Sequence, residues 1–249
     1  MPRTSVPTLG ACDVHVWDAR VSAFAAQASA LRATLDGSEL QRADRFRFER
    51  DRLQYVVAHG LVRALLGGYL ERPASVLRFA TGLYGKPALV EPAIHPPLEY
   101  NLSHSGDVVL IAVARQRAVG IDVERWAKHI VYDELAEYCF SAAERSELRA
   151  ASHHDKAAAF FAGWTRKEAY IKATGLGITA GLDYFDVSLG PGNAAKLLRD
   201  RRPNSSAGWR MVDLPLGAGY SGAVVACGYD WRLRRIPLAH DALALGAAP

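Results

Sequence analysis

Two acidic residues lie one position apart at the end of an apolar stretch, in VGIDVER (119–125). Residues i and i+2 of a strand point the same way, so we expect Asp122 and Glu124 on one face. Two such charges repel unless a cation or a shared proton relieves them, and Mg²⁺ also leaves coordination positions for substrate phosphates. The alternative is an exposed strand end with solvated acids, where Glu124 pairs with Arg125 or another base. An isolated Asp-x-Glu favours that simpler interpretation.

A second group of polar residues follows helical spacing in GWTRKEAYIKATG (163–175). One face of the predicted helix carries Trp164, Glu168, Ile171, Lys172 and Gly175, with Lys167 at its edge. An ordinary Glu–Lys pair one turn apart is worth a few tenths of a kcal/mol. Such a pair accounts for Glu168 and Lys172 but not for Trp164 and Gly175 on either side of them. The segment therefore predicts a third carboxylate and a lysine directed at one site.

The segment NLSHSG (101–106) combines hydroxyls with an imidazole. Ser103 and His104 are adjacent, so in an extended chain they face opposite ways and make a poor nucleophile–base pair. The chain also lacks the Gly-x-Ser-x-Gly elbow around a nucleophilic serine. Contact with phosphate suits these donors better. The alternative is a turn whose serine hydroxyls cap its own backbone.

The elements that would position these residues follow from the hydrophobic pattern. Strands are predicted at 12–17, 107–114 and 118–124, with a short turn at 115–117, and again at 183–189, 208–216, 220–229 and 231–236. Long helices are predicted at 53–70 and 160–177, and glycines end both. Residues 76–90 predict a strand, a glycine-rich turn and a short strand.

The two halves of the chain repeat one plan, in which a polar segment precedes a long helix and then strands. We therefore expect an α+β fold of two similar subdomains, residues 1–115 and 116–249. Each would be a small, mostly antiparallel sheet packed on a long helix. A ligand site is expected where the two subdomains meet.

Composition limits the classes of function. Half of the 249 residues are hydrophobic, and the net charge of +4 suits an anionic substrate or partner. Five arginines in QRADRFRFERDR (41–52) suggest a nucleic-acid surface, but no aromatic-rich or repeated pattern supports binding along a strand. We therefore expect no nucleic-acid partner. Three separated cysteines argue against disulfides and zinc, and no signal peptide or membrane span is recognisable, so we expect a cytoplasmic protein without a membrane anchor.

Four motifs in order resemble the 4′-phosphopantetheinyl transferases: YGKP (84–87), NLSHSG (101–106), GIDVE (120–124) and WTRKEAYIKATGLGI (164–178). The chain is similar to the surfactin-synthetase type, in which one polypeptide holds two pseudo-symmetric halves. The resemblance spans about residues 40 to 190. It implies a monomer that uses Mg²⁺, or Mn²⁺, and coenzyme A. Such an enzyme moves the phosphopantetheine arm onto a serine of an apo carrier protein and releases adenosine 3′,5′-bisphosphate.

The resemblance also implies roles for individual residues. Metal binding would fall to Asp122, Glu124 and Glu168, and catalysis to Glu168, Lys172 and Asp122. Coenzyme A would be held by Arg45, Arg52, Lys86, Pro87, Ser103, His104, Lys167 and Lys172. Gln54 stands where relatives often carry a basic residue for the 3′-phosphate, and Arg52 or Arg50 is expected to supply that charge.

Two other functions remain as alternatives. One is a non-catalytic protein that binds coenzyme A or another nucleotide, although intact acids and Lys172 count against it. The other is a nucleic-acid-binding protein that uses the arginine segment. For the transferase, the carrier is expected to be an acidic helical domain that docks in an apolar groove near the junction of the halves. Fatty-acid, polyketide and non-ribosomal peptide carriers are all compatible with the sequence.

Overall fold

The computed structural model describes residues 5–91, 96–127, 130–177, 181–190, 194–202, 208–239 and 243. The N-terminal half contains, in order, β1 (Asp13–Arg20), the 3₁₀ helix η1 (Val21–Gln27), α1 (Ala28–Arg32), α2 (Gly37–Asp44), α3 (Glu49–Leu70), β2 (Arg78–Thr81), β3 (Pro87–Glu91), β4 (Leu98–Ser105) and β5 (Val108–Arg115). The C-terminal half contains β6 (Val119–Arg125), α4 (Tyr132–Cys139), α5 (Ala142–Ala150), α6 (Lys156–Thr174), β7 (Phe185–Val187), β8 (Leu197–Asp200), β9 (Trp209–Asp213), β10 (Tyr220–Cys227) and β11 (Arg232–Pro237).

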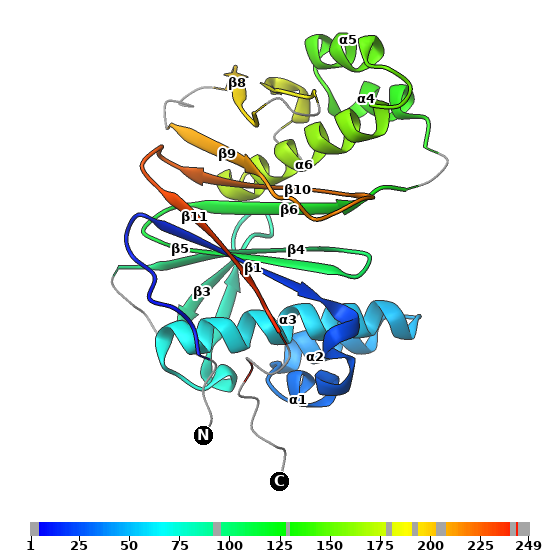
Figure 1. Cartoon of the computed structure of the whole chain (residues 1–249). Coiled ribbons are helices and arrows are strands. Elements are labelled where there is room, and N and C mark those ends of the chain that lie inside the picture. The colour runs from blue at the N-terminus through cyan, green and yellow to red at the C-terminus, as the bar shows by residue number, and fades with distance from the viewer. Residues whose placement is uncertain are drawn as a thin grey trace.

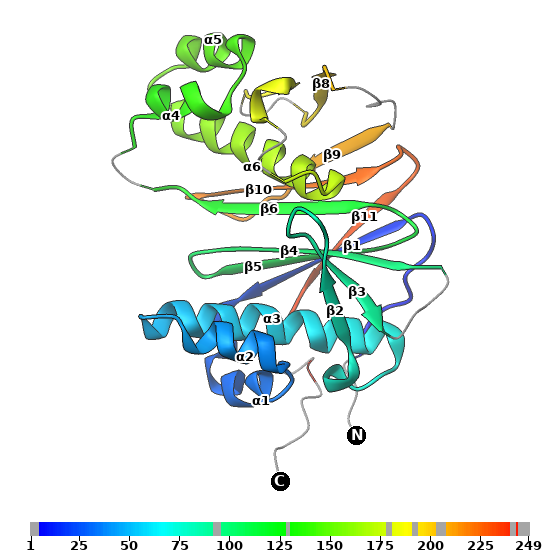
Figure 2. The same ribbon diagram turned by 180° about the vertical axis from the view of Figure 1, so that it is seen from behind.

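Two sheets lie face to face between two helical layers (Figure 1). One sheet has the strand order β11-β1-β5-β4 and the other β6-β10-β9. Helix α3 covers the outer face of the first sheet and α6 covers that of the second, as the view from behind also shows (Figure 2). The predicted α+β class, with small and mostly antiparallel sheets on long helices, is confirmed.

The two halves repeat one topology. The order β1-β5-β4 in the first sheet matches β6-β10-β9 in the second, so in each half the first strand pairs with the fifth and the fifth pairs with the fourth. A two-stranded hairpin follows the long helix in each half, β2-β3 after α3 and β7-β8 after α6. Strand β11 departs from the repeat because it crosses back and pairs with β1 in parallel. The division of the chain at residues 115 and 116 stays a prediction, and the last strand lies in the first sheet.

Each layer boundary holds an apolar core. One cluster fills the space between α3 and the first sheet, and a second packs α6 on its own sheet. A third lies between the sheets and includes Leu110, Ile121, Val224 and Trp231. Strand β5 is covered on both faces, which explains its continuous apolar sequence VVLIAVA.

Several predicted boundaries were wrong. Residues 99–125 form three strands, because NLSHS belongs to β4, and β8 was not predicted. Strands β5 and β6 lie in different sheets, so residues 116–118 carry the chain between layers. Helix α3 continues through Gly67 and Gly68, and Glu71 ends it in the left-handed conformation. Within the described ranges, none of the helices combines the length and apolar character that crossing a bilayer demands.

Candidate active site

The site lies where the edge strands of the two sheets meet. Strand β4 ends one sheet, β6 ends the other, and the two strands are in contact. Helix α6 packs on β6 from the outer side. The helix can approach closely because Gly120 has no side chain. A Cβ at this position would overlap backbone atoms of Ala169 and Ala173. Gly175, with φ of 70°, ends the helix in the left-handed conformation that glycine adopts without strain.

The two acids of β6 both project toward β4, as the strand period predicts. Asp122 is 3% exposed, and its Oδ1 accepts hydrogen bonds from Lys172 Nζ at 2.6 Å and Ser103 Oγ at 2.9 Å. Glu124 Oε2 accepts from Ser105 Oγ at 2.8 Å. A solvated strand end would leave these carboxylates in water, so the simpler interpretation of the Asp-x-Glu pair does not hold.

Burial and mutual repulsion raise the pKa of two carboxyls. Burial, and then the charge of Asp122, raise the pKa of Glu168 to about 7, while Lys172 opposes the rise. Burial and Asp122 also raise the pKa of Glu124, against hydrogen bonds from Ser105 and Trp164. Acids from β6 and α6 therefore act on one another electrostatically, and a cation would stabilise all of their charged forms.

Two oxygen atoms in this cluster fit a divalent cation. Asp122 Oδ2 and Glu168 Oε1 are buried and have no hydrogen-bond partner. A buried carboxylate oxygen without a partner is costly unless a cation meets it. The described ranges hold no ready group of three or more His, Cys, Asp or Glu side chains for a metal ion. The two carboxylate oxygens without partners fit an ion such as Mg²⁺, which often uses one or two carboxylates and completes its shell with water and phosphate.

Lys86 comes from the other half of the chain and joins the hairpin β2-β3 to α6. Its Nζ donates to the carbonyls of Val119 at 3.1 Å and Ala173 at 3.3 Å. Burial lowers the pKa of this lysine. Lys86 thus lies at the C-terminal end of α6, where its ammonium satisfies a helix carbonyl, and Pro87 begins β3. Their predicted contact with coenzyme A stays a prediction.

Ser103 and His104 face opposite sides of β4, which agrees with the argument against a nucleophile pair. Ser103 faces β6, where its hydroxyl meets Asp122, whereas Tyr100 and Leu102, on the His104 face, pack on α3. Burial, and then the charges of His59 and Lys172, lower the pKa of His104 to about 4. The imidazole is therefore neutral at pH 7 and offers one N–H donor.

The prediction that Lys167 contacts phosphate is corrected by its surroundings. Lys167 is completely buried, and its Nζ lies 2.7 Å from Glu144 Oε2, 2.7 Å from the Leu182 carbonyl and 2.6 Å from the Phe185 carbonyl. Neighbouring helical residues lie about 100° apart, so the residue before Glu168 faces away from the acids. Lys167 therefore stabilises the packing of α5 and η4 (Leu182–Tyr184) on α6.

The internal repeat supports this structural role. Arg63 occupies the same distance from the end of α3 as Lys167 does from the end of α6. Its Nε lies 2.6 Å from Glu39 Oε2. Both glutamates are the third residue of a short helix and complete the capping box at its start. Each long helix thus uses one buried cation to hold the short helix before it.

The arginine segment lies at the start of α3. Arg45 is exposed after α2, and Arg52 pairs with Glu49. Gln54 Nε2 donates to the Gly106 carbonyl at 2.7 Å and so ties α3 to the turn after β4. The structure brings Ser103, Asp122, Glu124, Glu168 and Lys172 together. It shows no contact of Arg45 or Arg52 with them among the described residues, and their nucleotide contacts stay predictions.

Sequence reasoning placed Asn101 and Ser105 in the candidate segment NLSHSG but gave neither residue a role of its own. Both lie on the Ser103 face of β4, at i−2 and i+2, and both hydrogen-bond to β6. The alternation of polar residues in NLSHS was the available signal, but the segment was not assigned to a strand.

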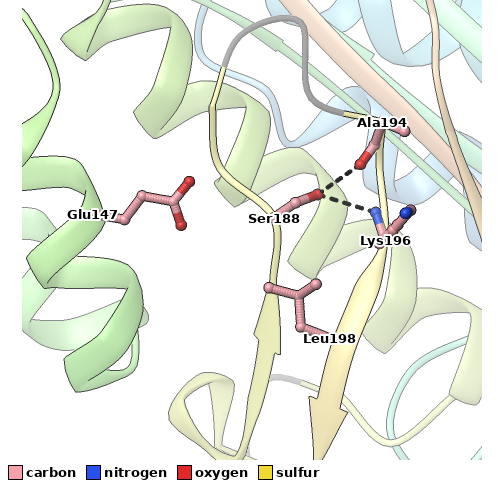
Figure 3. A pocket seen from close by; sticks show the side chains of 5 residues that line it. All are labelled: Glu147, Ser188, Ala194, Lys196 and Leu198. Atoms are coloured by element: carbon pink, nitrogen blue, oxygen red, sulfur yellow. Dashed lines mark hydrogen bonds between the residues drawn. The ribbon is translucent and has the colours of Figure 1, made fainter.

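A separate hollow of about 300 Å³ lies between α5 and the β7-β8 hairpin (Figure 3). Ser188 on its wall already donates to the Ala194 carbonyl at 3.0 Å and accepts from the Lys196 amide at 3.0 Å. Leu198 and Glu147 complete the lining with Lys196 and Ala194. The hollow shares no residue with the carboxylate cluster.

Two family descriptions match consecutive parts of the chain. Residues 16–116 match "4′-phosphopantetheinyl transferase, N-terminal", and residues 118–225 match "4′-phosphopantetheinyl transferase superfamily". The 4′-phosphopantetheinyl transferase HetI of Nostoc sp. is 34% identical over 232 residues, which are 93% of this chain and 95% of HetI. Psf-1 of Bacillus pumilus is 36% identical over 73% of this chain and 74% of its own length. Sfp of Bacillus subtilis is 30% identical over 77% and 81%.

Proposed function

The chain belongs to the 4′-phosphopantetheinyl transferase superfamily, and from this premise we propose its reaction in detail. The enzyme transfers the 4′-phosphopantetheine arm of coenzyme A to a serine of an apo carrier protein. It needs Mg²⁺ and releases adenosine 3′,5′-bisphosphate. The observation that carries this proposal is the cluster of Asp122, Glu124 and Glu168 with Lys172, in which two buried carboxylate oxygens lack partners.

The groups of the cluster match the needs of phosphoryl transfer. The carrier serine attacks the phosphorus next to the pantetheine arm, and the bond from that phosphorus to the bridging oxygen of adenosine bisphosphate breaks. Negative charge spreads over the phosphoryl oxygens, so catalysis depends mainly on positioning and charge neutralisation. A divalent cation, when bound, neutralises phosphate charge in this way, and Asp122, Glu124 and Glu168 would hold it.

Glu168 and Lys172 carry the proton and the leaving-group charge. Glu168 would take the serine proton; its pKa of about 7 belongs to the cation-free cluster, and a bound cation would lower it. Lys172 Nζ is held by Asp122 Oδ1, so its charge is fixed next to the acids. This ammonium would stabilise the leaving phosphate as its charge builds. Both halves contribute to the site within one chain, so we propose that the monomer is active.

The test is intact-protein mass spectrometry of apo carrier proteins mixed with this chain, coenzyme A and Mg²⁺, with and without a chelator. We expect a metal-dependent mass gain of one phosphopantetheine, together with adenosine 3′,5′-bisphosphate. The variant Asp122→Ala should remain folded by circular dichroism and transfer nothing. If fatty-acid, polyketide and non-ribosomal peptide carriers all stay unmodified while coenzyme A still binds, the chain is a non-catalytic binder. A folded Asp122→Ala variant with normal turnover would refute the proposed cation site.

A further inference from the structure

Side chains, rather than backbone, join the edges of the two sheets. Strand β6 pairs with β10 on one side, and on the other side its amides meet side chains of β4. Asn101 Oδ1 accepts from the Ile121 amide at 2.8 Å. Ser103 Oγ accepts from the Val123 amide at 3.3 Å, and Ser105 Oγ from the Arg125 amide at 3.0 Å. We call Asn101, Ser103 and Ser105 the side-chain ladder.

The geometry of the ladder follows from the strand period. Alternate residues of β4 face β6, and alternate amides of β6 face β4, so rungs recur at every second residue. An amide that is buried without a partner costs free energy, and the ladder supplies partners that a second backbone edge would otherwise give. Asparagine and serine suit this role because their side-chain oxygens span the gap between β4 and β6, which belong to sheets that are stacked rather than coplanar.

Two rungs of the ladder also hold acids of the candidate site. Carboxylates at neutral pH only accept, so the Ser103 hydroxyl donates to Asp122 and the Ser105 hydroxyl donates to Glu124. Ser103 Oγ further accepts from Lys172 Nζ at 3.2 Å. With one donor and two acceptors in use, its hydrogen-bonding capacity is filled. The expected phosphate contact of Ser103 would require one of these bonds to break.

We propose that Ser103 and Ser105 are positioning residues that aim the Asp122 and Glu124 carboxylates at the bound cation. Each hydroxyl oxygen accepts a hydrogen bond from a backbone amide of β6. This bond restricts the direction in which the hydroxyl proton points, and therefore the orientation of the carboxylate that accepts it. The register between the two halves of the chain thereby sets the orientation of the acids. Residues that hydrogen-bond to a metal-binding carboxylate typically have a large effect on the affinity for the metal. The inference rests on the cation site of the proposed function.

Asn101 provides the matched control. Among the described residues it gives a rung to β6 without a hydrogen bond to any of the three acids. Asn101→Ala therefore removes one link between the sheets and leaves the carboxylates held. Ser105→Ala removes a comparable link together with the hydrogen bond to Glu124. Ser105→Thr keeps the hydroxyl, and a β-branched residue suits a strand.

The experiment is a titration of the full chain with Mn²⁺, followed by electron paramagnetic resonance of the free ion, without coenzyme A or carrier. Ser103→Ala and Ser105→Ala should weaken Mn²⁺ binding by about 10- to 100-fold. Asn101→Ala should bind Mn²⁺ like the wild type, although its thermal unfolding temperature falls with those of the serine variants. Ser105→Thr should restore the affinity. Ser105 is half-buried, so its variants decide the matter if Ser103→Ala does not fold.

Three results would overturn the inference, in different ways. Unchanged Mn²⁺ affinity in folded serine variants would leave the ladder a purely structural link. Equal losses in Asn101→Ala would show that the affinity follows the docking of the sheets and not the hydroxyls. Absence of Mn²⁺ binding by the wild type would refute the cation site and the inference together. By contrast, a wild type that binds Mn²⁺ but modifies no carrier would refute only the proposed reaction.

Discussion

Replacing Glu168 by glutamine should stabilise the metal-free protein at alkaline pH. The pKa of this buried carboxyl rises from its ordinary value of 4.5 to about 7. Each unit of difference between the folded and unfolded states corresponds to about 1.4 kcal/mol, so the folded state is penalised by up to about 3 kcal/mol once Glu168 is ionised. Glutamine has a similar shape and no charge, which removes the penalty.

The sign follows from the proton balance. Between pH 4.5 and 7 the unfolded chain has lost the Glu168 proton and the folded chain still holds it. The contribution of the group to stability is therefore fully present below pH 4.5 and is lost as the pH rises through 7. Glu168→Gln should resemble the wild type near pH 4.5 and exceed its stability by an amount that grows until about pH 8.

The assay is urea unfolding at a series of pH values from 5 to 8 in the presence of a chelator. Glu134→Gln, which replaces an exposed carboxylate on α4, serves as the control for the same substitution outside the cluster. Adding Mg²⁺ should stabilise the wild type and reduce the advantage of Glu168→Gln. A difference that is equal at pH 5 and pH 8, or a variant that is less stable at pH 8, would refute the electrostatic account of the cluster.

Three further substitutions test separate parts of the site. Lys172→Ala should lower turnover more than it weakens coenzyme A binding, as measured by steady-state kinetics and calorimetry; equal losses would mean that Lys172 only binds. Lys167→Met should cost about 3–5 kcal/mol in urea unfolding because it leaves Glu144 buried and unpaired, while the folded protein keeps its coenzyme A affinity. Loss of that affinity at unchanged stability would restore Lys167 as a phosphate contact. Gly120→Ala should destabilise the protein by about 1–3 kcal/mol and lower turnover, since the new methyl group pushes α6 from β6. Wild-type stability and turnover would show that α6 need not lie so close.

Short-range periodicity explains what the sequence predicted well. Asp122 and Glu124 share a face because the strand period is local, and Glu168 and Lys172 share a face because the helix period is local. Neither rule needs knowledge of a distant partner. The glycine at position 175 likewise marks the end of α6 through its own backbone preference.

Partners from distant segments explain what could not be predicted. Strand β4 was missed because Asn101, Ser103 and Ser105 are common in turns, and their oxygens are satisfied only by amides of β6. The orientation of the Lys167 side chain depends on Glu144, which belongs to the capping box of α5, a different helix. Helical spacing places two lysines near Glu168, but only burial distinguishes the one that faces the acids.

Equivalent positions of the two halves differ in whether they carry acids. Arg20 is the last residue of β1 and Arg125 is the last residue of β6. Three residues before these arginines, β1 has Trp17 and β6 has Asp122. The residue after the buried cation is Ala64 in α3 and Glu168 in α6. Trp17 instead donates its indole N–H to the Tyr69 hydroxyl at 2.8 Å, so this position serves the core. The duplicated fold supplies two equivalent helix–strand faces. Only the C-terminal half places acids there, and the N-terminal half contributes the edge strand whose hydroxyls hold them.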